Sequence, residues 1–242
     1  TRSEVELNFT VNATDTNTLG VKLNDSPMNL SDDGDTWSLV ASTNFFGCLT
    51  DGNCSLTAIA TDVVGNTNTT DYIIIVDNTA PRIYNLRSND TDNITESGTP
   101  LTFSVNSTDD HNISDEHIIT NIKTVKLNGT LMIKDGSTPP DVFQTVNTTS
   151  DFLCTEDKDC HLTATTIDLA GNTNSTNYTI NVDNDAPEVY ISLSTNFSET
   201  TRKNVTITAE ANDQNLKDIW INVQVPGIYN DDINFTSQSN FS

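Results

Sequence analysis

Basic residues are scarce in this 242-residue sequence, which has 11 lysines and arginines against 34 aspartates and glutamates and a formal charge of −23. A nucleic-acid-binding surface needs clustered positive side chains to neutralise phosphates, and a surface that binds anionic lipids has the same need. The composition therefore excludes nucleic acid as a partner and predicts no direct membrane contact in this segment. A surface this negative is expected to attract cations.

Long apolar runs are also missing. No stretch of 18 consecutive apolar residues occurs, so we expect no membrane-spanning helix. The sequence has no signal peptide and no initiating methionine, and Thr1 opens directly on a strand-like segment. We interpret the chain as a processed or excised piece of a longer secreted protein, with any anchor outside it.

Motifs for catalysis are absent as well. The three histidines, His111, His117 and His161, fall in no H-E-x-x-H pattern, and neither G-x-S-x-G nor a phosphate-binding glycine loop occurs. Carboxylates are abundant, but they are scattered over predicted turns and strand faces, and a general acid needs burial to shift its pKa. We therefore expect that the protein is not an enzyme. The alternative is a set of accessory domains from a larger enzyme.

What the sequence does contain is an internal repeat. Residues 48–81 and 154–187 align without a gap at a spacing of 106 positions and share both cysteines. A spacing of this kind indicates tandem structural units. The predicted units are 1–78, which begins near the second strand of the unit, 79–184, and 185–242, which stops about halfway. Other matching segments are residues 9–15 with 103–109 and residues 21–24 with 125–128.

Apolar and polar residues alternate within each copy, and this alternation predicts β strands. Residues 7–12 alternate, as do residues 101–105, and in the last strand we expect Tyr72, Ile74 and Val76 to face the core. Turn dipeptides separate the strands, and no amphipathic helix of ten residues appears. Short strands, frequent turns and about 100 residues per unit predict an all-β fold of tandem immunoglobulin-like β-sandwich domains in a linear array.

A signature near the end of the first copy consists of Ala58, Asp62, Gly65, Asn66, Val76, Asp77, Ala80 and Pro81, and the second copy has the same residues 106 positions later. This signature resembles the immunoglobulin-like repeats of large bacterial and archaeal surface adhesins and envelope proteins. The resemblance covers the whole chain, although the third copy lacks the signature end. It implies that most repeats act as spacers and that only some act as binding tips.

Sequons for N-glycosylation, Asn-x-Ser/Thr, are more frequent than chance predicts. With 31 asparagines and 59 serines and threonines in 242 residues, about seven or eight matches are expected at any fixed spacing. Serine or threonine follows asparagine at one residue in 8 cases, at three residues in 6, and at two residues in 18, never with proline between. Strand alternation explains part of this excess but not the sequons in predicted loops.

We therefore predict covalent N-glycans, which would hydrate the surface and block pairing between exposed strand edges. Asn24 is left out because Pro27 follows its sequon, and Asn53 because Cys54 is expected to be cross-linked. The predicted acceptors are Asn8, Asn12, Asn29, Asn68, Asn89, Asn93, Asn106, Asn112, Asn128, Asn147, Asn174, Asn177, Asn196, Asn204, Asn234 and Asn240.

The four cysteines form two local pairs at the same place in the repeat, Cys48 with Cys54 and Cys154 with Cys160. Pairing between copies would require two separate sandwiches to touch, so we predict one disulfide within each copy. Disulfides form in oxidising compartments, which is consistent with an extracellular position on the cell surface or in the cell envelope. Zinc is the alternative, but no second cysteine pair or histidine lies at ligand spacing within a copy.

The resemblance to adhesin repeats also implies Ca²⁺ at the junctions between repeats, held by aspartate side chains. Hard oxygen ligands in negative surroundings suit this ion. The alternative is structural, because Asp-x-x-Gly-Asn forms a tight turn in which the aspartate accepts backbone N–H bonds. No cofactor is otherwise expected to be required. The candidates are Asp15, Asp62, Asp77, Asp109, Asp168 and Asp183.

The second copy carries an insertion of about ten residues within 109–125, which contains His111, Asp115, Glu116 and His117. Both a solvated charged connection and a metal- or ligand-binding loop are consistent with it.

From these observations we predict a structural component of an extracellular assembly, such as a stalk, sheath, filament or S-layer, on a prokaryotic and by resemblance archaeal cell. Its partners would be neighbouring copies of itself or other envelope proteins. One alternative is an adhesin that binds a host, cell or glycan ligand. Another is a filament subunit that assembles by strand donation, because residues 1–78 begin near the second strand of the unit.

Overall fold

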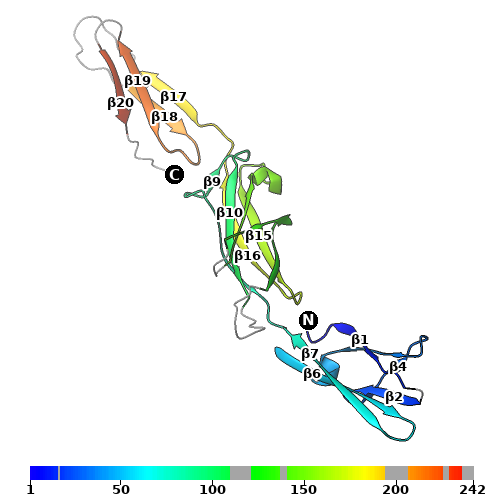
Figure 1. The fold of residues 1–242 in the computed structure, drawn as a ribbon. Helices are drawn as coiled ribbons and strands as arrows, with labels where there is room; N and C mark the ends of the chain where they lie inside the picture. The colour runs from blue at the N-terminus through cyan, green and yellow to red at the C-terminus, as the bar shows by residue number, and fades with distance from the viewer. Residues whose placement is uncertain (16, 110–120, 137–140, 194–206, 226–228, 236–242) are drawn as a thin grey trace, which may run out of the picture.

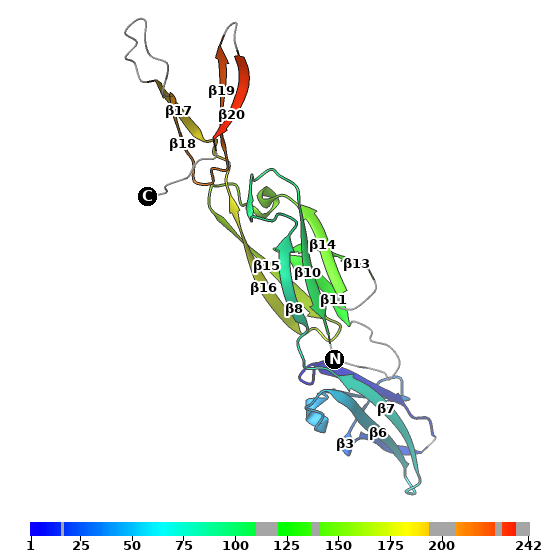
Figure 2. The same ribbon diagram turned by 90° about the vertical axis from the view of Figure 1, so that its left-hand side faces the viewer.

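Alternating side chains place most of the chain in β strands, as the sequence predicts. The computed structural model describes residues 1–15, 17–109, 121–136, 141–193, 207–225 and 229–235. Apart from two short 3-10 helices, the regular structure of these residues consists of strands, and no helix among them is long and apolar enough to cross a membrane. The three copies follow one another end to end in both views (Figures 1 and 2).

The first copy contains two sheets. One has the order β1 (Glu6–Asn12), β5 (Thr36–Ser42), β4 (Asn29–Leu30). The other has the order β3 (Ser26–Pro27), β2 (Thr18–Leu23), β6 (Gly52–Asp62), β7 (Thr67–Val76). Trp37 from the first sheet and Leu56 from the second lie in one core, which makes the copy a β-sandwich.

The second copy repeats this plan with an additional strand in each sheet. One sheet has the order β13 (Ile133–Asp135), β14 (Asp141–Asn147), β10 (Leu101–Thr108), β8 (Arg82–Ser88). The other has the order β12 (Thr130–Leu131), β11 (Ile122–Leu127), β15 (Asp159–Asp168), β16 (Thr173–Val182), β9 (Ile94–Thr95). Because β9 pairs in parallel with β16, the chain crosses from one sheet to the other between β8 and β9.

In the third copy, the described residues form two antiparallel pairs. One pair consists of β17 (Glu188–Leu193) and β18 (Ile207–Asn212), and the other of β19 (Ile219–Val225) and β20 (Tyr229–Phe235). The chain is therefore an all-β array of tandem immunoglobulin-like sandwiches.

Each of the first two copies has a hydrophobic core of its own. Phe103 and Leu162 are completely buried in the second copy, and Val76 and Leu56 are buried in the first. The two clusters share no residue. Burial of these side chains stabilises each sandwich separately, since a fully buried aliphatic or aromatic side chain contributes roughly 1.5–3 kcal/mol.

Tyr72 departs from the predicted pattern. We expected its side chain to face the core together with Ile74 and Val76, but it is 67% exposed. Its counterpart Tyr178 is half-buried, because Ser88 at the end of β8 lies against its hydroxyl group. Among the described residues, no strand lies beside β1 in the way that β8 lies beside β10.

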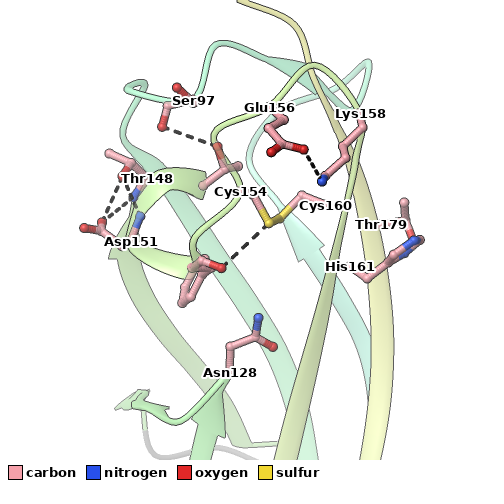
Figure 3. Close-up of a disulfide and its surroundings, with 12 residues drawn as sticks. Ser97, Asn128, Thr148, Asp151, Cys154, Glu156, Lys158, Cys160, His161 and Thr179 are labelled. Atoms are coloured by element: carbon pink, nitrogen blue, oxygen red, sulfur yellow. Dashed lines mark hydrogen bonds and ion pairs between the residues drawn. A yellow bond between two sulfur atoms is a disulfide. The ribbon is translucent and has the colours of Figure 1, made fainter.

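Disulfides join Cys48 to Cys54 and Cys154 to Cys160, the pairs that the repeat indicated. In the second copy the bond connects the segment after helix η2 (Thr149–Phe152) to the start of β15 (Figure 3). A capping box fixes the helix: the Asp151 N–H donates to Thr148 Oγ1, and the Thr148 N–H donates to Asp151 Oδ2. The first copy has its helix η1 (Asn44–Phe46) at the corresponding place.

Replacing Cys48 and Cys54 with alanine should lower the stability of the first copy by about 2 kcal/mol, because the closed loop is short. Denaturant unfolding measures this change when it is followed by the fluorescence of the buried Trp37 in a chain whose other tryptophan is replaced, Trp220→Phe. The matched control replaces Cys154 and Cys160, and it should leave the Trp37 transition in place. Equal shifts from both variants would contradict separate cores.

A candidate cation site at the junction between repeats

Three aspartate side chains from two copies meet at the first junction. Asp77 follows β7 of the first copy, Asp109 follows β10 of the second copy, and Asp168 ends β15. One carboxylate oxygen from each lies within 4.8 Å of the others. Their exposed fractions are 4%, 4% and 0%, so these three carboxyl groups lie together away from solvent.

The turn after β15 holds Asp168 in place. Asp168 Oδ1 accepts the backbone N–H of Gly171 at 2.6 Å and that of Asn172 at 2.8 Å. Gly171 has a φ of 92°, which only glycine adopts without strain. The Asp-x-x-Gly-Asn segment is thus the tight turn that we weighed against calcium binding, and it also delivers the carboxylate to the cluster. The two interpretations are compatible.

In the equivalent turn of the first copy, hydrogen bonds lower the pKa of the aspartate, Asp62. Burial raises the pKa of Asp62, but hydrogen bonds from the side chain and backbone of Asn66 and from the Val64 N–H together lower that pKa below 3.8. The carboxylate is therefore ionised at neutral pH. Because the folded-state pKa is depressed, the turn contributes stability at neutral pH that is lost as the pH falls through this lowered pKa.

Asn172 of the second copy forms hydrogen bonds with the linker that follows β7 of the first copy. Its Nδ2 donates to the carbonyl oxygens of Asp77 at 3.0 Å and Thr79 at 3.1 Å, and to Asp168 Oδ2 at 2.9 Å. Asn174 Nδ2 donates in the same way to the carbonyl oxygen of Pro81, at 3.0 Å. We did not predict these contacts from the sequence, although the recurrence of asparagine after the turn glycine was a signal for them.

A further asparagine belongs to each junction and was also missed. Asn121 is 3% exposed and lines a cavity of about 90 Å³ together with Asp77. Its counterpart in the third copy, Asn215, donates from Nδ2 to Asp183 Oδ2 at 2.6 Å. The counterpart in the first copy is Asn17. The signal in the sequence is the constant distance of four residues from each asparagine to an equivalent aliphatic residue of the following strand, Val21, Val125 or Ile219.

The six predicted aspartates are grouped across the copies. Asp77, Asp109 and Asp168 meet at the first junction, and within the described ranges they are the only cluster of three potential metal ligands. Asp15 and Asp62 line one cavity of about 370 Å³ in the first copy. Asp183 lies at the second junction, in a cavity of about 450 Å³. That cavity is also lined by the acidic residues Glu96, Asp185, Asp213 and Asp218.

Most described sequon asparagines lie on the surface. Those with exposed side chains are Asn8, Asn12, Asn29, Asn68, Asn89, Asn93, Asn128, Asn174 and Asn177. Asn106 and Asn147 are half-buried, and Asn234 lies in β20. Asn112, Asn196, Asn204 and Asn240 are outside the described residues, as is the insertion with His111, Asp115, Glu116 and His117.

No protein-family model and no curated protein matches the chain. Fibronectin(III)-like modules of Clostridium thermocellum CbhA align over 75% of this chain and 87% of theirs, with 10% identity and a TM-score of 0.39. A 1.5-MDa bacterial ice-binding adhesin aligns over 80% of this chain, with 18% identity and a TM-score of 0.39. A Ca²⁺-stabilized adhesin that helps an Antarctic bacterium bind ice also aligns over 80%, with 17% identity and a TM-score of 0.42. The chain spans 63% and 48% of the two adhesin structures.

If the junction holds Ca²⁺, the ion should stabilise the folded chain by about 2.7 kcal/mol at a concentration 100-fold above its Kd. Calorimetry in chelator and in added Ca²⁺ measures this as a rise in Tm. Asp109→Asn should abolish most of the rise, whereas the exposed Asp32→Asn, which is far from the junction in sequence, should retain it. A Tm that does not change when chelator is added would contradict Ca²⁺ binding at this site.

Proposed function

We propose that this chain is a spacer segment of an extracellular, N-glycosylated surface assembly, and that Ca²⁺ holds its successive repeats in a fixed orientation. The observation that carries this proposal is the meeting of Asp77 from one copy with Asp109 and Asp168 from the next. Such a segment belongs to a stalk, sheath, filament or S-layer, and its partners are neighbouring copies or other envelope proteins.

Electrostatics favours a cation at this junction. Like charges within a few ångströms repel strongly when they are buried, because the surrounding dielectric constant is low. Ca²⁺ takes six to eight oxygen ligands at 2.3–2.6 Å, and one carboxylate oxygen from each of three aspartates lies in this cluster. The negative charge of the whole chain raises the local cation concentration further. An ion here would link the two copies, since its ligands come from both.

Hydrogen bonds to the linker support rigidity. A flexible linker allows many relative orientations of two domains, whereas this one is held at several points. Asn172 and Asn174 bind the carbonyl oxygens of Asp77, Thr79 and Pro81, and Pro81 is itself buried. On the other side, Asp51 Oδ1 accepts the backbone N–H of Asn78 at 2.5 Å. The linker is therefore bound by groups from both copies.

Disulfides and exposed sequons support an extracellular position. Both copies contain a disulfide, which is stable in an oxidising compartment. Nine sequon asparagines have exposed side chains, where an oligosaccharide can be attached without disturbing a core. Glycans on these faces would keep neighbouring copies from pairing through their strand edges.

The occupancy of the sequons should differ from site to site, because hydrogen bonding engages the acceptor nitrogen at one of them. The atom that receives the sugar is Nδ2, and in Asn174 this atom donates to the carbonyl oxygen of Pro81 in a partly buried hydrogen bond. We expect low occupancy at Asn174 and high occupancy at Asn89 and Asn128, whose Oδ1 atoms accept hydrogen bonds from Thr102 and Thr163. Mass spectrometry of glycopeptides from the native protein measures each site. Full occupancy of Asn174 would show that this contact is dispensable.

Small-angle X-ray scattering of the 242-residue chain tests the proposed function. In Ca²⁺ we expect the scattering of one extended conformation, and in chelator a broader distribution of intramolecular distances. Asp109→Asn should show the chelator profile even in Ca²⁺, while Asp32→Asn should behave like the unmodified chain. Identical profiles with and without Ca²⁺ would contradict an ion-stiffened spacer.

A further inference from the structure

Each disulfide closes a loop of five residues that lies against the chain leaving its own copy. The loops are residues 49–53 in the first copy and 155–159 in the second, whose disulfide is drawn in Figure 3. Each loop connects the segment after a 3-10 helix to a long strand, β6 or β15. An extracellular position accounts for the oxidised cysteines, but it does not account for the equal placement of the two loops.

In the first copy, the loop is hydrogen-bonded to the linker that follows β7. Asp51 Oδ1 accepts the backbone N–H of Asn78 at 2.5 Å, and Asp51 Oδ2 accepts the hydroxyl group of Thr79. The carbonyl oxygen of Leu49 accepts Asn78 Nδ2 at 3.2 Å. Because Asn78 directly follows Asp77, the loop holds the backbone next to an aspartate of the junction.

The second copy makes the same contacts 106 positions later. Asp157 Oδ1 accepts the backbone N–H of Asn184 at 2.5 Å, and the carbonyl oxygen of Thr155 accepts Asn184 Nδ2 at 3.1 Å. Asn184 directly follows Asp183, which is the counterpart of Asp77. The contact between loop and linker is therefore a feature of the repeat and not of one junction.

The sequences of the two loops indicate which residue this contact requires. The loops read LTDGN and TEDKD, and the aspartate at the third position is the one residue that they share. The residue at the first position contributes its backbone carbonyl group, so leucine and threonine serve equally well. A loop that only joined a helix to a strand would not need a carboxylate at its third position, whereas a loop that binds the linker does.

Asn78 and Asn184 also bind a segment near the start of their own copies. Asn78 Oδ1 accepts the backbone N–H of Ser3 at 2.8 Å, and Asn184 Oδ1 accepts that of Ser97 at 2.9 Å. Each asparagine thus joins three parts of one copy: its first residues, its disulfide loop and its outgoing linker. The place at which the linker leaves the sandwich is set by these contacts.

The hydrogen bonds between loop and linker are exposed, so water competes with them. An exposed hydrogen bond persists when its groups are already held in place, because ordering a flexible loop at the moment of contact costs conformational entropy. A disulfide across five residues removes most of this freedom in advance. The cross-link therefore keeps the aspartate where it can accept the linker N–H.

We propose that Asp51 and Asp157 are positioning residues of the junctions, and that each disulfide serves to hold its aspartate against the outgoing linker. Reduction of the Cys48–Cys54 bond releases the Asn78 N–H and loosens the linker while the sandwich stays folded. This inference goes beyond the proposed spacer function. The loop fixes where the linker leaves its own copy through protein groups alone, whereas Ca²⁺ would act on the copy that follows.

Hydrogen exchange of the 242-residue chain, followed by NMR in the presence of chelator, tests the role of the aspartates. Asp51→Ala should speed exchange of the Asn78 amide about tenfold or more, because its hydrogen bond to a charged acceptor is lost. The Asn184 amide should not change. Asp157→Ala is the matched variant and should have the opposite pattern. Asp51→Asn keeps an acceptor oxygen and should retain most of the protection at Asn78.

The same measurement tests the disulfides. Removing the first one, with Cys48→Ser and Cys54→Ser, should raise the exchange rate of the Asn78 amide to its value in Asp51→Ala and leave Asn184 unchanged. Removing the second disulfide in the same way should affect Asn184 and leave Asn78 unchanged. Amides in the ladder between β6 and β7 should stay protected in every variant, which separates a loosened linker from an unfolded sandwich.

Three results would overturn the proposal. The Asn78 amide could exchange at one rate with and without the first disulfide, or Asp51→Ala could leave that rate unchanged. Protection could also fall equally across β6, β7 and the linker when the first disulfide is removed, which would show that the bond only stabilises the sandwich. Because chelator is present throughout, a failure of Ca²⁺ to bind at the junction would not alter these outcomes.

Discussion

Burial of three carboxylates at one junction is the constraint on which the arrangement of the repeats depends. Asp77, Asp109 and Asp168 come from the end of one sandwich and the beginning of the next, and each is at least 96% buried. Removing three negative charges from water is costly unless positive charge or hydrogen-bond donors approach them. The turn donors to Asp168 and the bridging amide of Asn172 supply part of this compensation, and a divalent cation would supply the rest.

Two parts of the first junction recur at the second, namely an aspartate at the end of one copy and an asparagine in the next. Asp183 ends the second copy as Asp77 ends the first, and Asn215 binds its carboxylate. Each of the first two copies carries its own core and its own disulfide. A chain built in this way can be lengthened by adding copies, with the orientation between neighbours set at each junction.

Sequence reasoning succeeded where the information is local. Alternation in residues 101–105 predicts a strand, and the spacing of the cysteines within a repeat predicts their partners. It failed where two distant segments decide the outcome. Alternation predicts the face of the strand on which Tyr72 lies, but it does not predict whether a neighbouring strand covers that side chain. The aspartates were recognised, but their grouping across the copies follows from how the end of β7 meets the ends of β10 and β15, which no spacing encodes. Asn172 was visible as a repeated residue, although its role as a bridge depends on the position of the linker.

The most direct measurement of the central claim is a crystal structure of the chain grown with Ca²⁺ and analysed by anomalous scattering. Our account predicts an anomalous peak at the first junction, with oxygens of Asp77, Asp109 and Asp168 at 2.3–2.6 Å from the ion. No peak at this position, or an ion bound by residues of only one copy, would contradict it.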